Sequence, residues 1–233
     1  MTVLLGIDDT DIPSSRGTGR LARQIADALS SDYTILGVTR HQLLVHPSIP
    51  YTSHNSSAVL HLGDGGEENS CEDIFRRARE LLMADYIEGS DPGLAVARED
   101  SVPPEVLDFG RSAKTQVLTQ GIALELADEC GILIEGLAGT RDGVIGALAG
   151  IGLAASQNDG RFIIRRRTRD LWGEQTVATL LDAGVDLVMT PGGEQISHGM
   201  VHLKKFPKPA LVDGQAVLFV ERWNGGYRDL VVG

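Results

Sequence analysis

The sequence predicts a mixed α/β (α+β) protein, built as one large domain or two smaller ones. Short runs of branched apolar residues, such as residues 3–7, are typical of buried strands, whereas residues 72–83 carry apolar side chains at helical spacing. The two kinds of segment alternate along 233 residues. A hydrophobic fraction of 42% and 28 glycines are typical of a compact globular protein with many loops.

An acidic cluster follows the first predicted strand, Val3 to Ile7. It consists of Asp8, Asp9 and Asp11, with Thr10 among them. Mg²⁺ prefers oxygen ligands, so the three aspartates are candidate metal ligands and Thr10 is a candidate additional ligand. A purely structural interpretation stays open, because Asp and Thr are also ordinary loop residues.

A threonine between two glycines precedes the first predicted helix, which runs from about Leu21 to Leu29. A helix N-terminus offers N–H donors and the positive end of the helix dipole, and glycine lets a phosphate come close. Gly17, Thr18 and Gly19 are therefore expected to cradle a phosphate. A simple helix cap at Thr18 is the alternative.

Arginines are expected to take the place of the lysine in the common phosphate-binding motifs. The sequence has no Gly-Lys-Ser/Thr and its first lysine is Lys114, which excludes the P-loop and protein-kinase schemes. Arg20, Arg40 and Arg98 are candidate phosphate clamps, because guanidinium groups bind phosphate in a bidentate manner.

The rest of the chain predicts further strands and helices in turn. The strands are expected at residues 34–40, 57–62, 94–97, 132–137, 161–167, 185–189, 197–203, 216–220 and 227–232, and the helices at 72–83, 103–110, 114–130, 144–156 and 176–184. The turn-rich residues 46–56 should form an exposed loop that places Asn55 and Ser56 at the mouth of the site. Several glycines in the helix 144–156 lower its propensity, so it should pack closely against a sheet. A cofactor cradle at residues 139–146 is left open, and residues 224–226 signal a hairpin.

The charge of the chain predicts its partners and its location. With 21 basic and 32 acidic residues the net charge is −11, so tRNA and other polyanions are not expected to bind. The most basic segment, residues 161–169, is either surface charge or an anion pocket. Cys71 and Cys130 are far apart and should stay reduced. No leader precedes Val3, and the longest apolar stretch is too short for a bilayer, so a cytoplasmic protein without membrane contact is expected.

Four ordered segments resemble one family, the archaeal agmatidine synthetases, which modify a cytidine of isoleucine tRNA with ATP and agmatine. The segments are residues 6–11 (GIDDTD), 49–55 (IPYTSHN), 91–103 (DPG, RED and VP) and 143–152 (GVIGALAGIG). The resemblance implies a kinase-like ATP-binding domain over residues 1–112 and a ferredoxin-like domain over residues 113–205. Residues 206–233 would form a C-terminal β-hairpin extension. The OB and zinc-ribbon modules expected to hold tRNA in that family have no counterpart in the sequence.

The resemblance also implies roles for the acidic cluster and for Thr18. Asp8, Asp11 and Thr18 become candidate catalytic residues, with Thr18 a candidate phosphate acceptor as in the equivalent loop of the family. The expected function is an ATP- and Mg²⁺-dependent phosphoryl transferase or phosphate-activating ligase that acts on a small molecule, such as an amine. Two alternatives stay open: a tRNA-modifying enzyme with a separate RNA-binding partner, and a non-catalytic ATP sensor. A homodimer is also left open.

Overall fold

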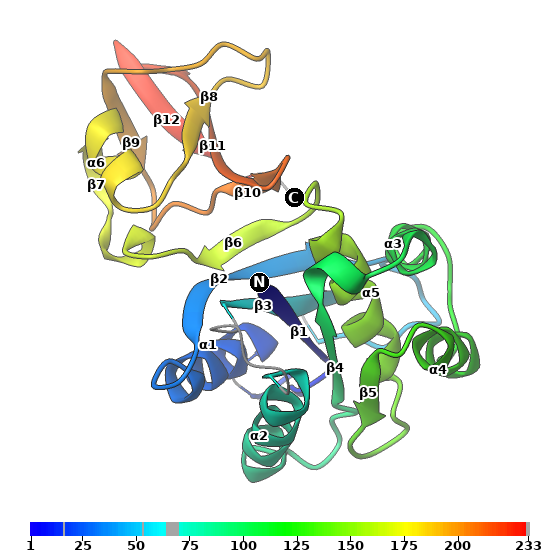
Figure 1. Cartoon of the computed structure of the whole chain (residues 1–233). Coiled ribbons are helices and arrows are strands. Elements are labelled where there is room, and N and C mark those ends of the chain that lie inside the picture. The colour runs from blue at the N-terminus through cyan, green and yellow to red at the C-terminus, as the bar shows by residue number, and fades with distance from the viewer. Residues whose placement is uncertain (16, 53, 64–69, 232–233) are drawn as a thin grey trace. The chain divides into compact units, whose positions relative to one another are not determined.

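The chain forms two compact units in the computed structural model, Met1–Ser156 and Gln157–Gly233 (Figure 1). The structure describes residues 1–15, 17–52, 54–63 and 70–231. Ser53, inside the predicted exposed loop, and Val232, the predicted end of the last strand, lie outside the described residues. Within them, no helix is long and apolar enough to cross a membrane.

Unit 1 is built on an antiparallel sheet with the strand order β5-β4-β1-β3-β2. Its strands are β1 (Thr2–Asp8), β2 (Thr34–Gln42), β3 (Ser56–Gly63), β4 (Gly93–Arg98) and β5 (Leu133–Gly136). Because β1 lies in the middle of the sheet, the side chains of residues 3–7 are buried on both faces. Fully buried strands show continuous apolar runs rather than alternation. The prediction of a buried strand over these residues is confirmed.

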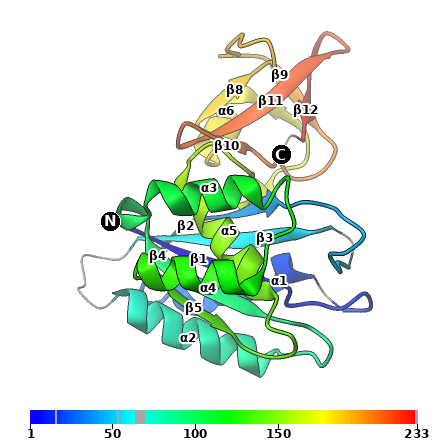
Figure 2. The same cartoon turned by 90° about the vertical axis from the view of Figure 1, so that its right-hand side faces the viewer.

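The helices of unit 1 cover both faces of this sheet. They are α1 (Thr18–Leu29), α2 (Ser70–Ala84), α3 (Pro104–Ser112), α4 (Gln120–Glu129) and α5 (Gly143–Ala155), with a short 3₁₀ turn η1 at Glu99–Ser101. α5 contacts β1, β3 and β4 on one face, with α3 and α4 packed on its outer side, and Figures 1 and 2 show α1 and α2 on the other face.

The glycines of α5 let the helix backbone approach the sheet closely. A Cβ atom on Gly6 of β1 would lie 2.5 Å from the carbonyl oxygen of Ala147. A Cβ atom on Gly150 of α5 would lie 2.7 Å from Ser57 Oγ and 2.9 Å from Val59 Cγ2 of β3, and one on Gly152 would lie 2.0 Å from the carbonyl oxygen of Val106 in α3. Each glycine costs roughly 1 kcal/mol of helix propensity. Close packing against the sheet offsets this cost, as the sequence predicted.

Unit 2 is a second sheet with one short helix. Its elements are β6 (Arg161–Ile164), η2 (Thr168–Asp170), β7 (Gly173–Thr176), α6 (Val177–Asp182), β8 (Leu187–Met189), β9 (Met200–Leu203), β10 (Ala210–Val212), β11 (Gln215–Trp223) and β12 (Gly226–Leu230). The strand order is β6-β10-β11-β12-β9-β7, and β8 pairs with β11 in parallel. The predicted hairpin joins β11 to β12, where Asn224 and Gly225 have positive φ angles of 45° and 79°. Positive φ at both central residues is the signature of a type I′ turn.

Several predicted elements differ in extent from the structure, three of them at segments that the sequence predicted to be longer. The helix expected over residues 114–130 begins only at Gln120, after an irregular segment. The basic strand expected to reach residue 167 ends at Ile164, and the strand expected from residue 197 begins at Met200. These segments carry the right polarity pattern for the longer elements. Pattern alone does not locate element ends.

The compact units divide the chain differently from the domain boundaries expected after residues 112 and 205. β5 pairs with β4 and α5 packs on β1, so residues 133–155 belong to the same unit as the first strands. The mixed α/β class is confirmed. The succession of a kinase-like domain, a ferredoxin-like domain and a hairpin extension stays a prediction.

Candidate functional site

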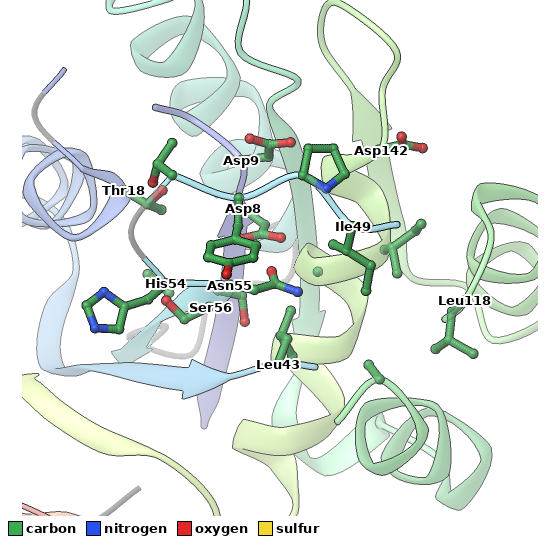
Figure 3. Close-up of a pocket in the computed structure, with 18 of the residues that line it drawn as sticks. Asp8, Asp9, Thr18, Leu43, Ile49, His54, Asn55, Ser56, Leu118 and Asp142 are labelled. Atoms are coloured by element: carbon green, nitrogen blue, oxygen red, sulfur yellow. The ribbon is translucent and has the colours of Figure 1, made fainter. Parts of the chain in front are cut away.

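A cavity of about 540 Å³ opens in unit 1 where β1 ends and α1 and α5 begin (Figure 3). Its walls come from the loop between β2 and β3, from residues 116–121 and from the start of α5. Nine of the residues singled out in the sequence line it: Asp8, Asp9, Asp11, Gly17, Thr18, Gly19, Arg40, Asn55 and Ser56.

The acidic end of the cavity consists of Asp8, Asp9 and Asp11. Asp8 is the last residue of β1, and its carboxylate lies against Gly146 of α5, where an added Cβ atom would be 1.8 Å from Asp8 Oδ2. Asp9 has a φ angle of 50°, which carries the chain out of the strand in a sharp turn. The strand end therefore directs three neighbouring acidic side chains toward one region of the cavity.

Hydroxyl groups hold the Asp11 carboxylate in place. Thr18 Oγ1 donates to Asp11 Oδ1 at 3.0 Å, and Thr52 Oγ1 donates to Asp11 Oδ2 at 3.0 Å. Thr10 is buried and its hydroxyl donates to Thr18 Oγ1 at 3.1 Å. Thr10 thus supports the site from behind and does not line the cavity.

Negative charge accumulates at this end. Burial, and next the negative charge of Asp9, raise the pKa of Asp8 to about 7. Burial, and next the charges of Asp91, Asp11 and Asp142, raise the pKa of Asp9 to about 6. One nearby cation, Arg40, lowers the pKa of Asp8, but its effect is smaller than those of burial and of the charges of Asp9 and Asp11. A site with such excess negative charge favours a bound cation.

The donor set fits Mg²⁺ chemically, because carboxylate and hydroxyl oxygens are hard ligands. Among the described residues, no group of three or more His, Cys, Asp or Glu side chains converges as a ready metal site. Mg²⁺ commonly takes one or two carboxylates and completes its octahedron with water and substrate phosphates. The arrangement fits that kind of site and does not fit an all-protein cage.

The raised pKa values predict a stability that falls with pH in the metal-free protein. A carboxyl whose pKa rises on folding, from 3.8 to about 7 for Asp8, stabilises the fold fully below pH 3.8, and this contribution is lost as pH rises through 7. We therefore expect Asp8→Asn to unfold at higher urea concentration than the wild type at pH 8 in EDTA. The difference should be roughly 2 kcal/mol and should shrink toward pH 4.

Asp32→Asn provides the matched contrast. Hydrogen bonds from Ser31 and Arg77 lower the pKa of Asp32, so its ionised form is the stabilising one. Neutralising Asp32 should not stabilise the protein at pH 8. Equal urea midpoints for wild type and Asp8→Asn at pH 8 would show that burial does not penalise the Asp8 charge.

Hydrogen bonds to β2, β3 and their loop hold Arg40 and Asn55. Arg40 Nε donates to Ser56 Oγ at 2.7 Å, which aims a half-buried guanidinium at the acidic end. Asn55 Nδ2 donates to the carbonyl oxygen of Leu44 at 2.7 Å, and this bond ties the cavity loop to the end of β2. Asn55 therefore shapes the cavity wall in addition to lining it.

The apolar end of the cavity was not predicted. It consists of Leu43, Ile49, Leu118 and Ile145, with the half-exposed ring of Tyr51 among the lining residues. Figure 3 shows Leu43, Ile49 and Leu118 on the far side of the cavity from Thr18. Except for Ile145 in α5, these residues lie in loops, where apolar residues give no periodic signal, so only their placement by the fold marks them as site residues. The start of α5 adds Asp142 and Gly146, at the edge of the segment considered as a cradle.

Asp91 joins these parts without lining the cavity. Its N–H donates to the carbonyl oxygen of Asp9 at 3.1 Å, and its own carbonyl accepts the N–H of Gly143 at 3.1 Å. Its carboxylate accepts the N–H of Thr140. Asp91 therefore fixes the acidic end against the start of α5.

Two of the arginines proposed as phosphate clamps do not line the cavity, and Thr18 does not have the helix-capping role that was its alternative. Arg20 is exposed on the first turn of α1 and does not line the cavity. Arg98 pairs with Val3 in the sheet, whereas Asp8 pairs with Gly93, so Arg98 lies at the opposite end of β1. Thr18 does not cap its helix: Gly17 occupies the cap position, and no side-chain cap bond forms.

Comparison with known proteins identifies similar solved structures. No protein-family model and no curated protein sequence matches the chain. A tRNA fluorescent labeling enzyme matches with a TM-score of 0.56 and 26% identity over 65% of this chain and 36% of its own. TiaS in complex with tRNA and ATP matches with a TM-score of 0.55 and 26% identity over the same shares. Apo TiaS, a tRNA agmatidine synthetase, matches at 24% identity and a TM-score of 0.55.

These matches correct the expectation that tRNA is not a partner. The similar structures are a tRNA labeling enzyme and an enzyme solved in complex with tRNA. The net charge of −11 is a sum over two units of different charge, so it does not exclude tRNA as a partner. The matched region spans about a third of the length of the similar chains. The resemblance to agmatidine synthetases that the four sequence segments predicted is confirmed.

Proposed function

We propose that the chain binds ATP in the cavity of unit 1 and uses it to modify tRNA. The observation that carries this proposal is the division of the cavity into an acidic and an apolar end, in a chain of which 65% matches TiaS, as solved with tRNA and ATP, at 26% identity. The small amine that the sequence predicted as the substrate is kept in this proposal as the second substrate beside tRNA. An amine such as agmatine would be the group attached to the tRNA, as the family resemblance implies.

The two ends of the cavity suit the two ends of ATP. The purine base would lie against Leu43, Ile49 and Leu118, because apolar walls favour a flat, weakly hydrated ring. The triphosphate would extend toward Asp8 and Asp9, where its charge requires a bound cation between phosphate and carboxylate.

One or two Mg²⁺ ions, each held by one or two of Asp8, Asp9 and Asp11 and completed by water and phosphate oxygens, would neutralise the phosphates and polarise the bond that breaks. Arg40 of β2 would add a second positive group to the same end of the cavity. Gly17 and Gly19 would let the phosphates approach the first turn of α1. Phosphoryl transfer depends mostly on positioning and electrostatics, which these groups supply.

Thr18 is proposed as the phosphate acceptor. Its hydroxyl donates to Asp11 Oδ1 at 3.0 Å, which is the arrangement of a nucleophile beside a base. In the step, the Oγ1–phosphorus bond forms, the hydroxyl proton passes to Asp11, and the bond from phosphorus to the leaving nucleotide oxygen breaks. Its position at the first residue of α1 presents this oxygen to the cavity.

The test follows labelled agmatine into tRNA in the presence of Mg-ATP. Wild type should label tRNA only with ATP, and intact-mass spectrometry should show a phosphate adduct on Thr18. Thr18→Ser should keep both signals, and Thr18→Ala should lose both by at least 100-fold. ATP-dependent labelling that survives in Thr18→Ala would reject the role of Thr18. Binding of ATP without any tRNA product would reject the proposed function and favour an ATP sensor.

A further inference from the structure

We propose that unit 2 carries an RNA-binding surface formed by the segment around η2 and the segment after β9. This basic surface consists of Arg166, Arg167, Arg169, Lys204, Lys205 and Lys208, with the indole of Trp172 beside it in sequence. The proposal rests on the proposed function only in the choice of RNA as the polyanion. None of its residues belongs to the cavity of unit 1.

The two segments are brought together by the antiparallel pairing of β7 with β9, in which Gly173 lies opposite Leu203, and by the contacts of Arg169 and Lys208 with the Phe206 ring. The guanidinium carbon of Arg169 lies 4.1 Å from the centre of the Phe206 ring, and Lys208 Nζ lies 5.3 Å from it. Arg169 also donates to the carbonyl oxygen of Ile163 at 3.1 Å. Cations that are far apart in sequence therefore share one region of unit 2.

Most cations of the basic surface lack carboxylate partners, unlike other arginines of unit 2. Arg165 pairs with Asp186 at 3.0 Å, and Arg228 pairs with Glu221. Among the described residues, no ion pair involves the exposed side chains of Arg166, Arg167, Arg169, Lys204 and Lys205. Unpaired like charges repel one another, and a polyanion relieves that repulsion while releasing its counterions.

The overall charges of the two units also favour unit 2 as the place where a polyanion binds. Residues 157–233 hold ten Lys and Arg against nine Asp and Glu, whereas residues 1–156 hold 11 against 23. The negative balance of the chain therefore lies entirely in unit 1. The negative charge of unit 1 repels a polyanion, whereas the unpaired cations of the basic surface on unit 2 attract it.

Trp172 favours RNA over an acidic protein as the partner. Its side chain is 76% exposed, which is rare for the largest apolar side chain. No ring contact to it is formed by any residue that the structure describes. Exposed aromatic rings beside arginines stack nucleic-acid bases, and acidic peptides offer no such group.

The test measures tRNA binding by the full chain in filter-binding assays over a range of salt concentrations. Arg166→Gln with Arg167→Gln should weaken binding about tenfold at 0.1 M salt and lower the slope of log K against log salt by about one to two, because two phosphate contacts are lost. Lys204→Gln with Lys205→Gln should act in the same way. Trp172→Ala should weaken binding about fivefold or more with no change in slope.

The matched control removes two exposed, ion-paired arginines of unit 1, Arg76→Gln with Arg111→Gln. This control should change the tRNA affinity by less than about twofold, because neither arginine belongs to the basic surface. Circular dichroism and the urea midpoint show whether each variant is folded. ATP binding to the cavity, measured on the same variants, should not change.

The outcomes separate this inference from the proposed function. If the unit 2 variants and the control bind tRNA as tightly as wild type does, the surface assignment is wrong, whether or not tRNA is modified. If poly-glutamate binds as tightly as tRNA and Trp172→Ala has no effect, the surface serves an acidic protein and the RNA assignment fails. If tRNA binds through this surface but no ATP-dependent product forms, the proposed function fails and the surface stands.

Discussion

Neutralising the acidic end, by Asp8→Asn with Asp9→Asn, is expected to remove most metal-dependent affinity for ATP. Two of the carboxylates that face a bound dication lose their charge, while the size and shape of the side chains are kept. We expect the Kd of Mg-ATP to rise by about 100-fold or more, which corresponds to roughly 3 kcal/mol. Isothermal titration calorimetry with Mg²⁺ and with EDTA measures the effect directly.

The loss of Mg-ATP affinity in this double variant should come with a gain in the free energy of unfolding. Such a gain would show that the loss of affinity does not result from misfolding. Burial raises the pKa of both carboxyls, so removing their charges relieves a cost that the fold carries at pH 8. The control is Asp108→Asn with Asp128→Asn, two exposed acids of α3 and α4. An unchanged Mg-ATP affinity in a folded double variant of Asp8 and Asp9 would reject the metal assignment.

Gly146→Ala is expected to displace Asp8 and so to disable the cavity. The added Cβ atom would lie 1.8 Å from Asp8 Oδ2, 2.4 Å from Asp8 Cγ and 2.9 Å from Asp8 Cβ. Asp8 is held at the end of β1, beside β3 and β4, so its backbone cannot retreat without disturbing the sheet. We expect a loss of about 1–3 kcal/mol in the free energy of unfolding from overpacking, despite a gain of up to ~1 kcal/mol in helix propensity.

The effect on ligand binding should be large even where the protein stays folded. A carboxylate moved by about an ångström no longer meets a bound cation, so the Mg-ATP affinity should fall at least tenfold. Gly121→Ala in α4 is the control for stability, because nothing lies within 4 Å of a Cβ atom there and the helix should gain a few tenths of a kcal/mol. Wild-type stability together with wild-type ATP affinity in Gly146→Ala would contradict the close packing of α5 on Asp8.

The local elements of this protein could be predicted because their signals are local. The buried run Val3–Ile7 predicted β1, the glycines around Thr18 predicted the approach to α1, and Asn224 with Gly225 predicted the β11–β12 turn. The acidic cluster was found for the same reason, since its members are neighbours in sequence. The glycines of α5 predicted close packing, because nothing else explains their cost within a helix.

Other candidate residues lie away from the cavity, because their grouping depends on distance in space. Arg98 was grouped with the acidic cluster by chemistry, but the antiparallel register of β4 against β1 carries it to the far end of the strand. Arg20 has the right sequence neighbours, but it is exposed on α1 and does not line the cavity. The net charge did not exclude tRNA, because a sum over the chain hides its division between two units.

The sequence by itself determined which chemical groups this protein brings to its site: three neighbouring carboxylates, a threonine between glycines, and a family likeness that points to ATP. Residues close in the chain stay close in space, so such clusters survive folding unchanged. Tertiary structure alone decided what surrounds them. Sheet register and helix packing bring Asp91, Asp142 and Gly146 against Asp8 and Asp9, and they place Leu43 and Leu118 on the walls of the same cavity. These contacts join segments many residues apart, and no local pattern records them.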